Sequence, residues 1–140
     1  MIRQEAKYFV WCKGDRHQLS EHFSSHEFES QDAPEGSLQL ISVELVNRLE
    51  KLRSQLGKPL YITSAYRSTA HQRRIRGEGL KTSKNTSTHE LGMAVDISLY
   101  GHDTLKLIQL CEDLFQAVGI AKTFIHVDVR DDKKRRWTYS

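Results

Sequence analysis

Two stretches of the chain repeat their apolar residues at the period of an α-helix. The first covers residues 41–59 and spaces its leucines three or four residues apart, which places them on one helix face. These residues are Leu45, Leu49, Leu52 and Leu56. Ser42 is a suitable N-cap, and Gly57 and Pro59 end the pattern. We therefore expect an amphipathic helix with its leucine face against a core.

The second helical pattern covers residues 103–119. Asp103 or Thr104 can cap its start, and Gly119 lies just past its last apolar residue. The residues expected to line one face of this helix are Leu107, Cys111, Leu114 and Val118.

Strands are predicted in four short segments rich in β-branched or aromatic residues: 7–12, 60–63, 93–99 and 123–130. Residues 19–37 read as a loop, with Phe23 and Phe28 anchoring it to the core. Two helices and several strands without a regular βαβ alternation indicate an α+β fold. We expect a small antiparallel sheet flanked by the two main helices, in a single domain over residues 1–140.

The composition is that of a globular protein, with 140 residues, 38% hydrophobic and 28% charged. A formal charge of +3 is too small to indicate a nucleic-acid binder. Two basic runs stand out, Lys133–Arg136 and "HQRRIR" at residues 71–76. Each is either a solvated surface or a surface that attracts an anionic polymer. The sequence shows no signal peptide and no run of ~18 apolar residues, so we expect synthesis in the cytoplasm and no membrane insertion.

Several cysteines and histidines leave alternatives open. Cys12 and Cys111 form no C-x-x-C pair and read as two buried free thiols, although a disulfide between them stays open. The loop carries three histidines that are either surface residues or a metal cluster: His17, His22 and His26. His71 is either a polar helix residue or part of a site.

A third group of histidines and carboxylates favours a metal site. Asp96 stands in an apolar strand after His89, which is costly for a carboxylate unless a cation or solvent compensates. In the strand 123–130 the side chains alternate, so His126, Asp128 and Arg130 share one face, which is either a solvent face or part of a site. Two imidazoles and one carboxylate make a three-ligand zinc site with a fourth position left for water. "HELGM" is not the H-E-x-x-H motif, because its fifth residue is methionine.

Three blocks together resemble a known family: "ITSAYRS", "STHELGMAVDI" and "FIHVDVR". They are similar to the signature blocks of the zinc D-alanyl-D-alanine carboxypeptidase and L-alanyl-D-glutamate endopeptidase family, which is related to the hedgehog and lysostaphin zinc folds. The pattern S-x-H-x-x-G-x-A-x-D is met by Ser87, His89, Gly92, Ala94 and Asp96. The upstream segment resembles members of phage origin, and the resemblance covers about residues 19–130.

The resemblance implies roles for individual residues. It makes His89, Asp96 and His126 the ligands of a Zn²⁺ ion on the sheet, with Ser87 supporting the His89 loop. Arg67 would bind a substrate carboxylate or carbonyl through its guanidinium fork. Some branches place a catalytic acid just before the last histidine, where this chain has Thr123 and Phe124.

The catalytic carboxylate is therefore expected after the last histidine, as in the H-x-D branch. Asp128 is the first candidate for the general base, with orientation of a zinc histidine as the equal alternative. Glu90 is the next candidate.

The resemblance implies a monomeric zinc metallopeptidase that cuts peptidoglycan stem peptides, either as a carboxypeptidase or as an endopeptidase. It would act at the bacterial cell wall after release from a cell or as part of a virion. The rival function is a non-catalytic, hedgehog-like zinc module that only binds a partner. A nucleic-acid binder would leave the three blocks unexplained.

Overall fold

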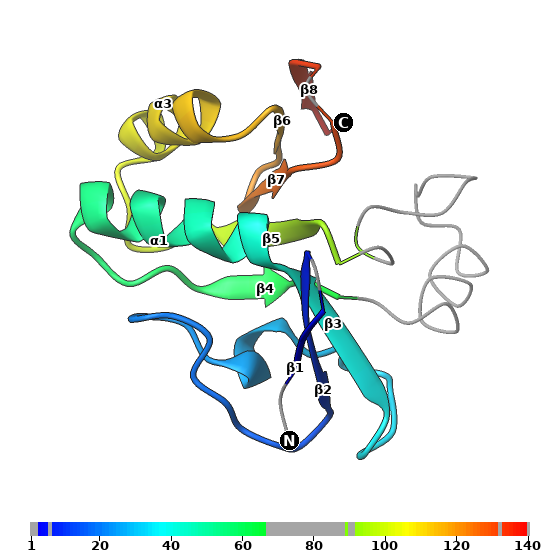
Figure 1. The fold of residues 1–140 in the computed structure, drawn as a ribbon. Helices are drawn as coiled ribbons and strands as arrows, with labels where there is room; N and C mark the ends of the chain where they lie inside the picture. The colour runs from blue at the N-terminus through cyan, green and yellow to red at the C-terminus, as the bar shows by residue number, and fades with distance from the viewer. Residues whose placement is uncertain (1–2, 6, 67–88, 90–91, 132, 140) are drawn as a thin grey trace.

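The structure is a computed structural model. It describes residues 3–5, 7–66, 89, 92–131 and 133–139. The described elements form two sheets, two α-helices and one short 3-10 helix (Figure 1).

The first sheet joins the N-terminus to the start of the first helix. It has three antiparallel strands in the order β1 (Arg3–Glu5), β2 (Tyr8–Cys12) and β3 (Leu38–Ser42). The strand predicted at residues 7–12 is confirmed as β2. The strand β3 was not predicted, because its short apolar alternation runs directly into the helix pattern.

The second sheet has five strands in the order β4-β5-β7-β6-β8. Their bounds are Ile62–Ser64 for β4, Ala94–Ser98 for β5, Phe124–Asp128 for β7, Ala117–Ile120 for β6 and Arg135–Thr138 for β8. The first three neighbouring pairs are antiparallel, whereas β6 and β8 are parallel. The α+β class is thus confirmed, and the expectation of a wholly antiparallel sheet is wrong at its β8 edge.

The first predicted helix is confirmed as α1 (Val43–Leu56). The Ser42 side chain accepts a hydrogen bond from the backbone N–H of Leu45 at 3.2 Å, which caps the first turn. Gly57 ends the helix in a left-handed conformation, and the predicted leucine face is buried.

The second predicted helix is confirmed only in its first part, as α3 (Thr104–Leu114) with Asp103 as its N-cap. The prediction is wrong for residues 115–118. Phe115 is extended, and Val118 is buried in the strand β6 rather than on a helix face. Arg136 of β8 donates hydrogen bonds to the backbone carbonyls of Glu112 at 3.0 Å and Phe115 at 3.3 Å, so the C-terminal end of the helix is held by the neighbouring strand.

The core lies between the helices and one face of the five-stranded sheet. Ile125 and Val127 of β7 are fully buried there, together with Val95 and Ile97 of β5. In Figure 1 the three-stranded sheet lies at the opposite end of the molecule from β8. The N-terminal loop, with its 3-10 helix η1 (Ser25–Phe28), is anchored by Phe23 and Phe28 as predicted, since both are buried with ring centroids 5.9 Å apart.

The two cysteines differ in their surroundings. Both are free, so no disulfide joins them, but Cys12 is exposed, contrary to the expectation of two buried thiols. Cys111 is buried in α3, and its burial raises the pKa of its thiol to about 12. That thiol therefore stays protonated and inert at neutral pH.

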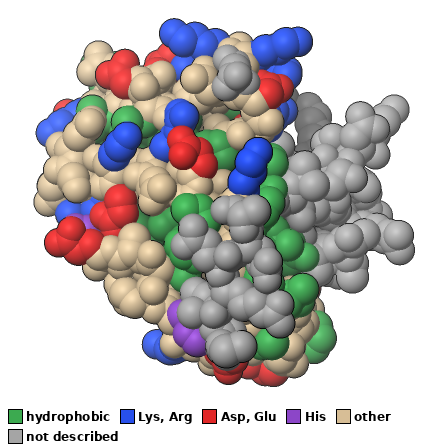
Figure 2. Space-filling view, viewed as in Figure 1, with side chains coloured by type: hydrophobic (Ala, Val, Ile, Leu, Met, Phe, Trp, Pro, Cys, Tyr) green, Lys and Arg blue, Asp and Glu red, His purple; other side chains and the backbone are tan. Residues whose placement is uncertain are grey.

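The C-terminal basic run is partly neutralised by acidic partners. Arg135 pairs with Asp131 at 2.8 Å, and Arg136 pairs with Glu112 at 3.2 Å. On the face shown in Figure 2, the Lys and Arg side chains are interspersed with Asp and Glu. The solvated-surface interpretation of Lys133–Arg136 is the one this arrangement favours. Within the described residues, no helix is long and apolar enough to cross a membrane.

Candidate metal centre

His89 is placed by a turn that is fixed against the first sheet. The N–H of Gly92 donates to the carbonyl of His89 at 3.2 Å, and the carbonyl of Gly92 accepts from the N–H of Ser42 at 2.8 Å. Gly92 has a φ of +67°, and a Cβ there would collide with the side chain and backbone of Leu40. Both conditions require glycine, which explains its place in the motif.

Asp96 and His126 are placed by strand pairing. They stand directly opposite each other on β5 and β7, so their side chains emerge on the same face of the sheet. The Oδ1 atom of Asp96 lies 3.0 Å from Nδ1 of His126 and 3.4 Å from Nε2 of His89. The exposed fractions of the three residues are 3% for His89, 8% for Asp96 and 4% for His126. One ligand atom from each residue lies within 4.8 Å of the others, so the group could hold a metal ion.

The other ring nitrogen of each histidine faces a hydrogen-bond acceptor. Nδ1 of His89 lies 2.7 Å from the carbonyl oxygen of Ala65, and Nε2 of His126 lies 2.7 Å from Oδ2 of Asp128. A carbonyl and a carboxylate only accept, so each of these nitrogens carries the hydrogen. In the neutral imidazoles the remaining lone pairs, on Nε2 of His89 and Nδ1 of His126, then face the Asp96 carboxylate. These three groups converge on one point, where either a metal ion or a proton on a ring nitrogen can sit between them.

Asp128 is engaged on both of its oxygens. It is fully buried, at 0% exposure, and the Arg130 guanidinium donates to it from Nε at 2.9 Å and from Nη2 at 2.6 Å. Burial alone would raise the pKa of Asp128, but the hydrogen bonds from His126 and Arg130 lower it to about 2. Asp128 is thus a carboxylate that already has partners, and it touches His126 at the nitrogen turned away from Asp96.

The electrostatics of the other two groups follow the same geometry. Burial acts to raise the pKa of Asp96, but the hydrogen bonds with His126 and His89 hold it well below its usual range. Burial acts to lower the pKa of His126, and the hydrogen bonds to Asp128 and Asp96 raise it. Without an ion, the positive charge that favours the ionised carboxylates is the proton on His126, and a cation bound between the three residues would replace it. Two imidazole nitrogens and one carboxylate oxygen are ligands that Zn²⁺ takes in proteins, so the residues present fit zinc.

The other predicted site residues stand as follows. Arg67, Ser87, Glu90 and His71 lie outside the described residues. The three loop histidines do not form a group that could hold a metal among the residues described. His22 instead contacts Glu50 at 2.9 Å, and His26 contacts the hydroxyl of Ser24 at 2.8 Å.

Sequence reasoning missed three contributors to the centre. Ala65 acts through its backbone carbonyl, which no sequence pattern reports. Arg130 was placed on the correct strand face but without a role, and its partner at two residues' distance, Asp128, was the available signal. Trp137 packs against His126 with ring centroids 5.3 Å apart, although the sequence placed it only at the end of a basic run.

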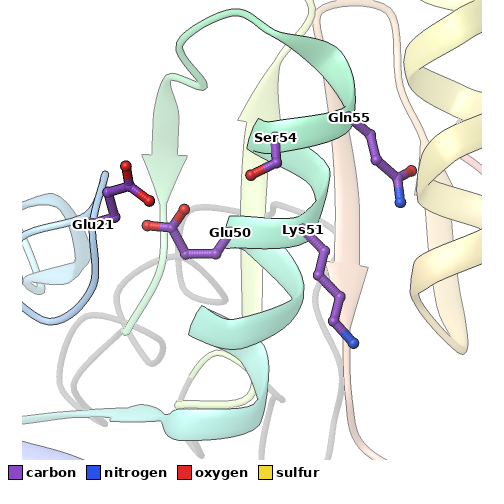
Figure 3. Close-up of a pocket in the computed structure, with 5 residues that line it drawn as sticks. All are labelled: Glu21, Glu50, Lys51, Ser54 and Gln55. Atoms are coloured by element: carbon purple, nitrogen blue, oxygen red, sulfur yellow. The ribbon is translucent and has the colours of Figure 1, made fainter.

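A separate hollow of about 340 Å³ lies between the N-terminal loop and α1. Figure 3 shows Glu21 reaching from the loop toward Glu50 on the helix. The hollow is lined by Glu21, Glu50, Lys51, Ser54 and Gln55. None of these residues belongs to the centre formed by His89, Asp96 and His126.

Comparison with known proteins agrees with the geometry. The family model described as peptidase M15 matches residues 21–128, which is well over half of the chain and contains all three converging residues. A search of curated proteins finds no match. The resemblance expected from the three sequence blocks is confirmed, and the match supports a metallopeptidase. The chain belongs to the peptidase M15 family.

Proposed function

We propose that the chain is a zinc-dependent peptidase that hydrolyses an amide bond in bacterial peptidoglycan peptides. The observation that carries this proposal is the convergence of three possible ligand atoms on one buried point, with the opposite nitrogen of each histidine already engaged. This arrangement occurs in a chain of the peptidase M15 family.

In this proposal His89, Asp96 and His126 hold the ion. Zinc bound there supplies a Lewis acid that activates water and polarises a carbonyl, which is the chemistry of amide hydrolysis. The Ala65 carbonyl and the Asp128 carboxylate fix the tautomers, so that each imidazole presents a lone pair to the ion.

We infer that Asp128 orients His126 and is not the general base. Its Oδ2 accepts from Nε2 of His126 at 2.7 Å, and both oxygens accept from Arg130. A carboxylate with a pKa of about 2 is also a weak base. Glu90, which lies outside the described residues, becomes the first candidate for the base.

Two further roles rest on the family resemblance. Arg67 would bind a substrate carboxylate or carbonyl, and Ser87 would support the loop of His89. Arg67→Lys keeps the charge but loses the bidentate fork. The folded, zinc-loaded variant should therefore lose most of its turnover of muropeptides. Turnover at the parental rate would exclude this role for Arg67.

We further propose a lytic enzyme of phage type, built as one peptidase domain over residues 1–140. The similarity of its upstream segment to members of phage origin supports this assignment. Such an enzyme would reach the cell wall after release from a cell or as part of a virion.

Digestion of purified peptidoglycan tests the proposal, with and without a chelator, followed by mass spectrometry of the products. Release of D-alanine indicates a carboxypeptidase, and a cut between L-alanine and D-glutamate indicates an endopeptidase. Chelator-sensitive cleavage is expected. An intact, zinc-loaded protein that leaves the peptides uncut would refute an enzyme acting on this substrate.

The rival function is a non-catalytic zinc module, and one observation favours it. Asp128 is engaged by His126 and Arg130, and Thr123 and Phe124 stand where some branches carry an acid. Such a module would bind peptidoglycan or another partner in a zinc-dependent way and release no product. The same digestion separates the two, because only an enzyme produces new termini.

A further inference from the structure

The strand between His126 and the C-terminal strand has almost no side-chain volume on the face of the metal centre. Gly119 of β6 is paired with His126 on β7 and with Trp137 on β8. Ala117, the neighbouring β6 residue on the same face, is paired with Asp128 and Arg135. His126 and Trp137 are therefore two strands apart, a separation of roughly 9–10 Å at the backbone. Only a large side chain lying across Gly119 can close that distance.

Trp137 closes it. A Cβ on Gly119 would lie 2.7 Å or less from three indole atoms, so the indole rests directly on the glycine backbone. Its ring centroid is 5.3 Å from that of His126, at an interplanar angle of 50°. Tilted ring pairs at this separation attract each other.

A second path from Trp137 also ends at His126. The Arg130 guanidinium lies over the indole, with its carbon atom 5.6 Å from the ring centroid. Arg130 donates to Asp128, and Asp128 accepts from Nε2 of His126. Four residues thus form a closed ring of contacts: His126, Asp128, Arg130 and Trp137.

We infer that Trp137 is a positioning residue for His126, which makes β8 part of the metal centre. This inference rests on the proposed function, since it takes His126 as a ligand. It also extends the centre beyond residues 21–128, where the family match ends. Asp128 fixes Nε2 of His126, Nδ1 points toward Asp96, and Trp137 restrains the ring from the side of β8. A ligand held in this way needs no reordering when the ion binds.

Gly119→Ala tests the inference without changing any residue of the ring. Gly119 is not among the glycines with positive φ, so the backbone accepts a side chain and the indole is what must move. Thr138→Ala is the control, because Thr138 lies beside Trp137 on β8, is exposed and is not part of the ring of contacts. Zinc affinity is measured by competition with a chelator. The absorption spectrum with Co²⁺ reports the geometry of the ligands, and metal-free thermal unfolding reports the fold.

A weakening of zinc affinity of about 10-fold or more, with an altered Co²⁺ spectrum, is expected for Gly119→Ala and not for Thr138→Ala. Trp137→Phe keeps an aromatic ring beside His126 and should retain more zinc affinity than Trp137→Leu. A role in apolar packing alone would give the two variants the same affinity. This second pair decides the question if Gly119→Ala does not fold. Parental affinity and spectrum in folded Gly119→Ala, or equal values for Phe and Leu at position 137, would overturn the inference. A parental protein that binds neither Zn²⁺ nor Co²⁺ would instead overturn the proposed function.

Discussion

The molecule contains two contacts between a histidine and a carboxylate that are similar in length but differ in their surroundings. His22 lies 2.9 Å from Glu50 at the surface, and His126 lies 2.7 Å from Asp128 inside the sheet. The side chains of the first pair are 32% and 18% exposed, whereas those of the second are 5% and 0% exposed. Burial is the first difference between them.

The second difference is what each pair is joined to. Glu50 receives donors, from the Ser20 hydroxyl at 2.6 Å and from the backbone N–H of His22, and thereby ties the N-terminal loop to α1. At the other pair, Asp128 takes one nitrogen of His126 and leaves the opposite nitrogen facing Asp96 and His89. Glu50 and Asp128 both accept from donors, so neither carboxylate needs an ion. What distinguishes the buried pair is that the remaining nitrogen of His126 belongs to a group of three residues that could hold a metal ion.

The largest expected effect is a loss of zinc, and it should follow from removing a histidine of the metal centre but not from removing His22. His89→Ala or His126→Ala deletes one of three protein ligands, so the zinc content should fall from about one ion per chain to nearly none. His22→Ala should keep the parental zinc content. Elemental analysis of the purified variants measures this difference. Full zinc content in either site variant would disprove the ligand assignment.

The next effect concerns the carboxylates that orient the histidines. Asp128→Asn is nearly isosteric but has a weaker acceptor for Nε2 of His126 and for Arg130. Zinc affinity should fall by about 10- to 100-fold, and turnover should return at saturating zinc. Glu50→Gln is the control and should bind zinc as the parent does. Unchanged affinity with lost turnover would instead make Asp128 the general base.

The smallest effect is a difference in stability at the surface pair. Burial would raise the pKa of Glu50, but the hydrogen bonds from Ser20 and His22 lower it in the folded state. A group with a lowered folded pKa stabilises the fold above its unfolded pKa and loses that contribution as pH falls through the folded value. Glu50→Gln should therefore reduce the free energy of unfolding by about 1 kcal/mol at neutral pH, and the difference should vanish in acid.

Denaturant unfolding of both proteins at several pH values measures that difference. A constant gap across the acidic range would mean that the ionised form of Glu50 is not what stabilises the loop. A change in zinc content in this variant would contradict the separation of the two regions.

The parts of the fold that were predicted are those set by local patterns. The leucine spacing of α1 and the alternation of β7 depend on neighbours within one element, and both are confirmed. The alternation also placed His126 and Asp128 on the face opposite Ile125 and Val127. The convergence of His89, Asp96 and His126 was reached from residue types together with the family blocks, and the triad lies together in the structure.

The parts that were missed depend on residues far apart in the sequence. "LFQAVG" continues the apolar period of α3, yet Ala117 and Val118 enter the sheet because β7 and β8 pair with them. The run "KKRRW" lies at the surface, but its charge does not report that Arg136 donates to carbonyls of α3 or that Trp137 contacts His126. The role of Asp128 depends on which ring nitrogen it touches, and residue order does not report this.

The register between β5 and β7 has a consequence for folding. Asp96 and His126 are direct partners, so a slip by one residue would bring Val95 or Ile97 opposite His126 and turn the imidazole toward the helices. An ion that binds only the correct alignment stabilises it by mass action, by ~2.7 kcal/mol when its free concentration is 100 times its Kd. Ion binding and strand alignment are thus one coupled equilibrium, in which the ion selects the register that creates its own site.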